Sequence, residues 1–331
     1  MKRKVVQHGP STLIISLPSK WIKENNVRKG DELDIKEEGK IIMVSTGDIK
    51  TDSYITQDVT DFDPLLVTTF LVRAYQKGYD KIHIIHNNPE VLKKIQEKTL
   101  ELIGYEIIEQ NNKYCLIQSI SSHIELDFDN SLRKAFIITK QMLEIAIKAY
   151  KETDIATLEG LQIMDLEVNR LCNFCLRQIN KEQYISAEQM QQSHTLYYLI
   201  EILEELGDVY KRMARNLAES KKKNNELIKI MQLLLEQNET AYSYFYKSTQ
   251  EKANSVYNIF NRIDGFIKEV LGTKLLQKEI LSIYSIIDST RILNHFITMR
   301  LDFLRDEQHD ILKNSHQSIG LDYKIKRAES Y

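Results

Sequence analysis

Residues 5–33 read VVQHGPSTLIISLPSKWIKENNVRKGDEL, and this stretch determines the architecture of the first fifty residues. Leu13, Ile15 and Leu17 alternate with Thr12, Ile14 and Ser16, which predicts a strand with one face more apolar than the other. Pro18 ends that strand and suits the first turn of a short helix over 19–25. Gly30 favours a turn with a positive φ. We therefore expect short strands around one brief helix, with a returning hairpin over 33–45.

A unit of this size, about 46 residues, can scarcely bury a core of its own. We therefore expect it to share a core with a second copy of the chain.

Charge is unevenly distributed along the chain. The 331 residues carry a net charge of −2, but residues 1–30 hold seven basic side chains and one acid, which gives +6. Residues 31–50 add three basic and six acidic side chains, so the first 50 residues net +3 and the remainder nets −5. A basic leading segment on an acidic protein predicts a local nucleic-acid footprint.

The segments Val5–Leu13, Ser16–Trp21 and Val27–Leu33 together resemble the AbrB/SpoVT swapped-hairpin family. The resemblance implies an interleaved homodimer whose basic strands and loop face DNA. It also leaves open that the domain binds a partner protein, as related antitoxin domains do. Lys and Arg side chains would displace counterions from phosphates and make the affinity dependent on salt. The candidate DNA-binding residues are Lys2, Arg3, Lys4, His8, Ser11 and Lys20.

The middle of the chain predicts a small α/β domain. The polar, acidic residues 51–63 suggest a linker. Residues 65–75 and 89–103 suit helices, 81–85 suits a strand, and 105–108 with 113–120 suit a hairpin. We expect this segment to space the two ends of the chain or to bind an unidentified ligand.

From about residue 130 the pattern is helical almost to the end, and it predicts an all-α bundle. We expect six helices, near 130–151, 154–180, 184–220, 224–250, 252–271 and 274–306. The third has apolar residues at steps of three and four, which predicts a buried stripe. On its flank Glu204 and Asp208 are one turn apart with Gly207 between them; adjacent carboxylates and a mid-helix glycine are both unfavourable.

The segment Leu203–Val209 resembles the Glu-x-x-Gly-Asp motif of the PhoU family, and Met164–Leu171 resembles that family's preceding helix. The resemblance implies two three-helix repeats over about 129–313. It also implies metal binding, by a divalent or iron-type ion, and restraint of phosphate transport through a transporter ATPase or a signalling kinase. An AbrB-type domain joined to such a bundle resembles an archaeal architecture.

The residues support only one metal cluster. Glu204 and Asp208 are the candidate ligands, whereas hard cations usually take six or more oxygens. Further ligands would have to come from other helices, with Asp165 as a candidate, or from a second copy of the chain. In the sixth helix the corresponding positions hold Ile287 and Arg291, and an arginine opposes a cation. A solvated acidic face is the alternative.

Composition excludes other classes. No run of 18 apolar residues suggests a membrane span, and the Met-Lys-Arg-Lys start does not suit a signal peptide. Three cysteines form no disulfide framework, which suits a reducing cytoplasm; Cys172 and Cys175 fall on an apolar helical stripe and are expected to be buried.

We therefore divide the chain into a DNA-binding and dimerisation domain (1–48), a linker with a small α/β domain (49–128), a PhoU-like domain (129–313) and a polar tail (314–331). The favoured function is a non-enzymatic regulator that binds DNA and senses phosphate status. A dimeric adaptor that docks a transporter ATPase or kinase is the alternative. A metal-dependent hydrolase is disfavoured because no nucleophile or phosphate-binding loop accompanies the carboxylates.

Overall fold

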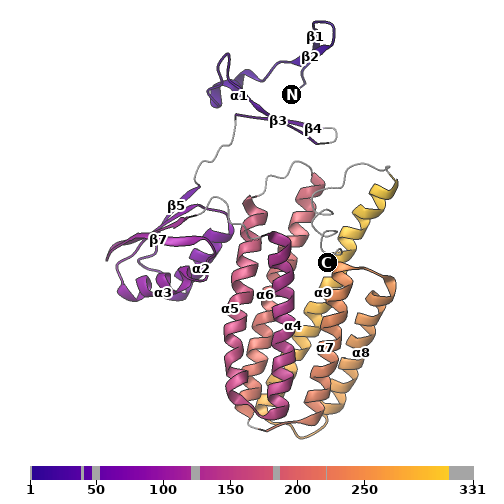
Figure 1. The fold of residues 1–331 in the computed structure, drawn as a ribbon. Coiled ribbons are helices and arrows are strands. Elements are labelled where there is room, and N and C mark those ends of the chain that lie inside the picture. The colour runs from indigo at the N-terminus through magenta and orange to yellow at the C-terminus, as the bar shows by residue number, and fades with distance from the viewer. Residues whose placement is uncertain are drawn as a thin grey trace. The chain divides into compact units, whose positions relative to one another are not determined.

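The computed structural model describes residues 2–38, 41–46, 53–120, 127–181, 187–220 and 222–312. The chain divides into two compact units, Met1–Asp52 and Ser53–Tyr331. Figure 1 shows both. The expected polar tail, residues 314–331, lies outside the described residues.

The first unit consists of two antiparallel hairpins and one short helix. Strand β1 (Val5–His8) pairs with β2 (Thr12–Ile15), and β3 (Asp34–Glu38) pairs with β4 (Ile41–Ser45). Helix α1 (Ser19–Glu24) follows Pro18, as expected. Gly30 has a φ of +99°, and Asp31 Oδ2 accepts a hydrogen bond from the Arg28 N–H at 2.7 Å. The predicted turn therefore forms.

Apolar side chains of these hairpins are exposed in the single chain. Val5, Val6, Leu13, Ile14, Ile15, Ile35 and Ile42 all rank among the exposed large hydrophobic residues. An isolated two-stranded hairpin is marginally stable in water. Among the described residues of the first unit, none is buried in a core, which fits the expectation from its length.

The second unit begins with a four-stranded sheet in the order β5-β6-β8-β7. Its strands are β5 (Tyr54–Asp58), β6 (Lys81–Ile85), β7 (Tyr105–Gln110) and β8 (Tyr114–Ser119), and its helices are α2 (Pro64–Gln76) and α3 (Pro89–Thr99). β5 and β6 are parallel, whereas β8 is antiparallel to both of its neighbours. The interpretation of 51–63 as a linker was therefore wrong for residues 54–58, which form an edge strand.

Local signals position the two helices of this segment. Asp63 and Asn88 cap them, each accepting a hydrogen bond from the backbone N–H two residues on, and a proline fills the first turn of each. Gly78, with a φ of +92°, follows the end of α2. These signals explain why the sequence located α2, β6 and the start of α3 closely. Helix α3 ends at Thr99, however, and not at residue 103 as expected.

The remainder of the second unit is a bundle of six helices within the described residues, as predicted. They are α4 (Phe128–Glu152), α5 (Ile155–Lys181), α6 (Ala187–Ser220), α7 (Asn225–Tyr246), α8 (Gln250–Leu271) and α9 (Gln277–Leu312). One apolar core runs through all six and includes the expected stripe of α6. Cys172 and Cys175 are buried in it, which confirms the expectation from their spacing.

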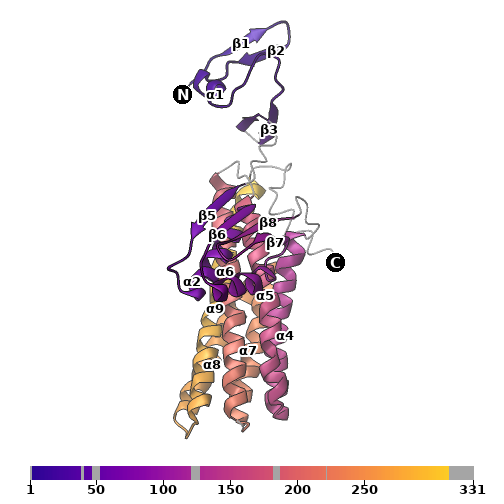
Figure 2. The same cartoon turned by 90° about the vertical axis from the view of Figure 1, so that its left-hand side faces the viewer.

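The α/β segment packs against the bundle beside α5 (Figures 1 and 2). Arg177 of α5 is buried, donates to the carbonyls of Tyr75 and Tyr79 at 3.0 Å each, and pairs with Asp80 at 2.8 Å. Its guanidinium also lies over the rings of Tyr75 and Tyr105. A buried, fully paired arginine thus joins the segment to the bundle, so the segment is an integral part of this unit.

Candidate nucleic-acid interface and acidic cluster

The six candidate DNA-binding residues lie on the first unit. Lys2, Arg3 and Lys4 lead into β1, His8 ends it, Ser11 precedes β2, and Lys20 lies on α1. All six are exposed. The β1–β2 hairpin therefore gathers five of them, while Lys20 comes from the helix.

These side chains are available to bind an anion. The Lys20 side chain is 87% exposed and its ammonium lies 3.7 Å from the Glu24 carboxylate, an exposed i,i+4 pair of little energetic weight. Exposed lysine and arginine on a short hairpin can contact phosphates without a large desolvation cost.

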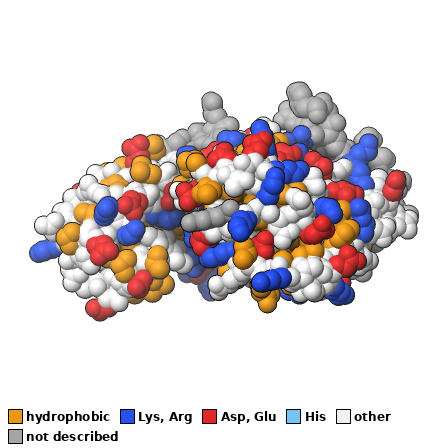
Figure 3. Space-filling model, turned by 90° about the horizontal axis from the view of Figure 1, so that it is seen from below, with side chains coloured by type: hydrophobic (Ala, Val, Ile, Leu, Met, Phe, Trp, Pro, Cys, Tyr) orange, Lys and Arg blue, Asp and Glu red, His pale blue; other side chains and the backbone are white. Residues whose placement is uncertain are grey.

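On one face of the molecule, seen in Figure 3, basic and acidic side chains of the described residues are interspersed. Such a face forms no extended basic surface for DNA. The uneven charge found in the sequence therefore favours the N-terminal unit as the part of the chain that contacts DNA.

The acidic residues of α6 are arranged around a lysine. Lys211 Nζ lies 2.6 Å from Asp165 Oδ2 and also contacts the Asp208 carboxylate. Asp165 on α5 is only 2% exposed. Burial raises the pKa of Asp165, and the hydrogen bond from Lys211 opposes that rise. The ammonium therefore occupies the space between these two carboxylates.

Glu204 lies one turn before Asp208 and has a different environment. Burial, followed by the nearby charges of Asp208 and Asp165, raises the pKa of Glu204 to about 7. Its carboxylate makes no hydrogen bond or ion pair with any described residue.

Among the described side chains, few oxygen ligands remain here for a metal ion. A lysine ammonium holds two of the three carboxylates, and hard cations require more oxygen ligands than Glu204 can supply. Across the described ranges, no three His, Cys, Asp or Glu side chains form a group that could hold a metal. Metal binding at Glu204 and Asp208 stays a prediction from the resemblance.

Gly207 has an ordinary structural setting. A Cβ atom there would lie 3.4 Å from Val168 Cγ1 and 3.5 Å from Asp165 Oδ1, both ordinary contact distances. The close packing of α6 on α5 is therefore compatible with glycine but does not require it.

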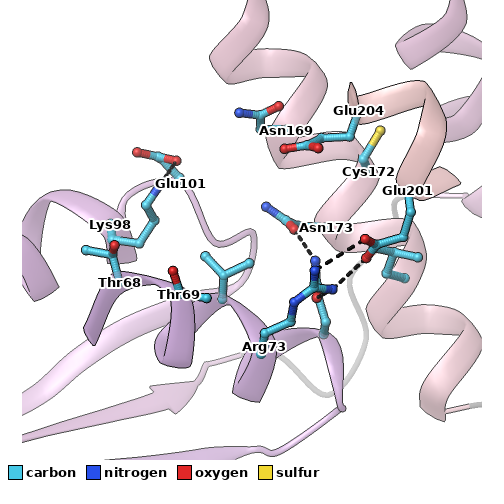
Figure 4. Close-up of a pocket in the computed structure, with 13 residues that line it drawn as sticks. Thr68, Thr69, Arg73, Lys98, Glu101, Asn169, Cys172, Asn173, Glu201 and Glu204 are labelled. Carbon is cyan, nitrogen blue, oxygen red and sulfur yellow. Dashed lines mark hydrogen bonds and ion pairs between the residues drawn. The ribbon is translucent and has the colours of Figure 1, made fainter. Parts of the chain in front are cut away.

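Sequence reasoning missed a cavity between α2 and α3 on one side and α5 and α6 on the other (Figure 4). It brings Glu204 together with residues far away in the chain, among them Arg73 and Lys98. No local motif marks such a site, since its walls meet only when the α/β segment packs on the bundle. Lys211 carried a local signal, because it lies three residues after Asp208 on the same helix.

The comparisons with known proteins agree with the class of protein that the first unit suggests, a small β domain of the MazE/AbrB type. Residues 6–51 match a family model described as "Antidote-toxin recognition MazE, bacterial antitoxin". The chain thus carries a MazE/AbrB-type domain at its N-terminus, followed by a mostly helical region. No curated protein shows significant similarity to it. None of the helices in the described ranges is both long enough and apolar enough to cross a membrane.

Proposed function

We propose that the chain is a cytoplasmic, dimeric regulator that binds DNA through its N-terminal domain. The observation that carries this proposal is the MazE/AbrB-type match over residues 6–51. The exposed basic residues of the β1–β2 hairpin and the +6 charge of residues 1–30 support it. The proposal assigns no catalytic step to the chain.

Dimerisation is part of the same proposal. The apolar side chains of both hairpins are exposed in one chain, and a second copy would cover them. A dimer would also present two copies of each basic hairpin to the two halves of a DNA site.

The helical region is proposed to relay phosphate status, with a phosphate transporter ATPase or a signalling kinase as its partner. The support is the resemblance of Leu203–Val209 to the PhoU motif, together with the six helices, which two three-helix repeats would require. Uptake of labelled phosphate should rise in cells that lack the protein, because PhoU-like proteins restrain transport. Unchanged uptake and unchanged expression of transport genes would contradict this part.

DNA binding is tested by fluorescence anisotropy of the full-length protein on DNA from its own upstream region, across a salt series. The double variant Arg3→Gln/Lys4→Gln should bind more weakly. The slope of log affinity against log salt should fall by about 0.9 for each lost phosphate contact. The matched control is Lys93→Gln/Lys94→Gln, since both lysines lie on α3 of the second unit. Absence of DNA binding by the wild-type protein at low salt would sink the proposal.

A second candidate follows from the description of the matched model, which names antidote-toxin recognition. In that case the N-terminal domain binds a partner protein, and the chain acts as a dimeric adaptor. A wild-type dimer that binds no DNA, and that loses a co-purifying protein when its hairpin is altered by Leu13→Lys, would favour this candidate.

A further inference from the structure

The cavity between the α/β segment and the bundle has a volume of about 200 Å³. Figure 4 shows Thr68, Thr69, Lys98 and Glu101 on one side, and Asn169 and Glu204 on the other. The cavity is thus large enough for a small organic molecule, and both parts of the second unit would contact it.

The cations that line the cavity already have partners. Arg73 forms a two-armed pair with Glu201 at 2.6 and 3.3 Å and donates to Gln76 Oε1 at 2.8 Å. Lys98 lies 2.6 Å from the Glu101 carboxylate. Neither side chain is left to bind an anion without losing its ion pair.

One carboxylate of the lining remains without a partner. Glu204 has no bonding partner among the described residues, and the buried Oδ1 of Asn169 likewise has none there. The lining holds two cations against three carboxyl groups, so its net charge is −1 when Glu204 is ionised. A half-buried carboxylate without a donor is unfavourable, and a cationic donor would satisfy Glu204.

Apolar groups limit the shape of the ligand. Val72 and Leu176 also line the cavity, one from each wall. An aliphatic chain could contact them while a charged end meets the remaining carboxylate. A divalent metal is less suitable, because Lys211 holds Asp165 and Asp208 and the remaining oxygens are few.

We propose that this cavity binds a small aliphatic primary amine, with the ammonium held by the Glu204 carboxylate and the carbon chain against Val72 and Leu176. The inference does not depend on DNA binding, since it concerns the second unit alone.

The test is isothermal titration calorimetry of the full-length protein with butylammonium chloride, with butan-1-ol as the neutral counterpart and NaCl as the salt control. Butylammonium should bind and butanol should not. Glu204→Gln should weaken binding at least tenfold. Glu205→Gln is the matched control, because Glu205 is the exposed neighbour on the same helix, and it should change nothing.

A second variant tests the location without altering charge. Val72→Phe should fill the cavity and abolish binding, whereas Leu66→Phe on the exposed part of α2 should not; circular dichroism checks that both remain folded. The proposal is overturned if butylammonium does not bind at millimolar concentration. It is also overturned if binding survives Glu204→Gln, or if Mn²⁺ rather than the amine binds in a manner that depends on Glu204.

Discussion

Arg177 is the side chain that most directly attaches the α/β segment to the bundle. It is 4% exposed and bonds two backbone carbonyls and Asp80. Removing one partner of a buried charge pair costs about 3 kcal/mol or more. Arg177→Met should therefore lower the free energy of unfolding by about 3 kcal/mol in urea titrations. Lys181→Met removes the more exposed partner of Asp80 and should cost less than 1 kcal/mol; equal losses would show that burial does not determine the effect.

Lys211 gives a second prediction at the residue scale, one that depends on pH. Lys211→Met would leave the buried Asp165 carboxylate without its cation, at a cost of about 3 kcal/mol at neutral pH. Burial already raises the pKa of Asp165, and loss of the lysine removes the hydrogen bond that opposes this rise. A carboxyl with a raised pKa in the folded state favours folding at low pH, and that benefit is lost as pH increases.

The loss caused by Lys211→Met should therefore be larger at pH 8 than at pH 5 when unfolding is measured at both. Arg212→Met is the control, since Arg212 is exposed and lies 3.9 Å from Asp288. A loss of stability that is independent of pH would mean that Lys211 does not affect the pKa of Asp165.

Single residues differ in how far the sequence predicts them. The burial of Cys172 and Cys175 followed from their spacing on an apolar stripe, and the structure confirms it. Arg177 comes directly after Leu176 in the sequence. Helical periodicity cannot show that its side chain binds two carbonyls and a carboxylate from residues 75–80. Its partners become evident only in the folded unit.

At the scale of elements, two glycines give predictions of opposite sign. Gly78 ends α2 with a φ of +92°, and a Cβ there would lie 2.9 Å from Lys181 Cγ. Gly78→Ala should cost about 1–2 kcal/mol through the left-handed backbone. Gly160 lies within α5 with open space around it, so Gly160→Ala should stabilise by up to about 1 kcal/mol. Thermal unfolding of both variants checks the signs; destabilisation by both would contradict the assignment of Gly160 to an ordinary helix interior.

The elements were predictable where capping residues and periodicity agreed. β6 falls at residues 81–85 as expected, and the six helices of the bundle follow their predicted order. β5 was missed because it is a short edge strand that alternates between exposed and half-buried residues in an acidic context. β5 is parallel to β6, and the chain connects the two strands through α2, so no hairpin signal marks β5.

At the scale of the whole molecule, the sequence predicted a small β domain, an α/β segment and a helical bundle, but not the cavity. The domain at the N-terminus had a continuous motif, whereas the cavity walls come from residues as far apart as Thr68 and Glu204. Sites built by packing two segments together have no signature in either segment. The same limit applies to the interface of a dimer, whose presence is inferred from the exposed apolar side chains of the hairpins.

Dimerisation through those hairpins gives the last prediction. Leu13 is 70% exposed in β2 and would be covered by a second copy. Leu13→Lys places a charge in that interface, so the full-length variant should elute as a monomer in size-exclusion chromatography with light scattering. It should also lose salt-dependent DNA binding, because the single β1–β2 hairpin of a monomer makes too few phosphate contacts. Leu100→Lys is the matched control, since Leu100 is 82% exposed just after α3 in the second unit. A Leu13→Lys protein that remains dimeric would place the dimer interface outside the hairpins, and a wild-type monomer that binds DNA would contradict the shared core.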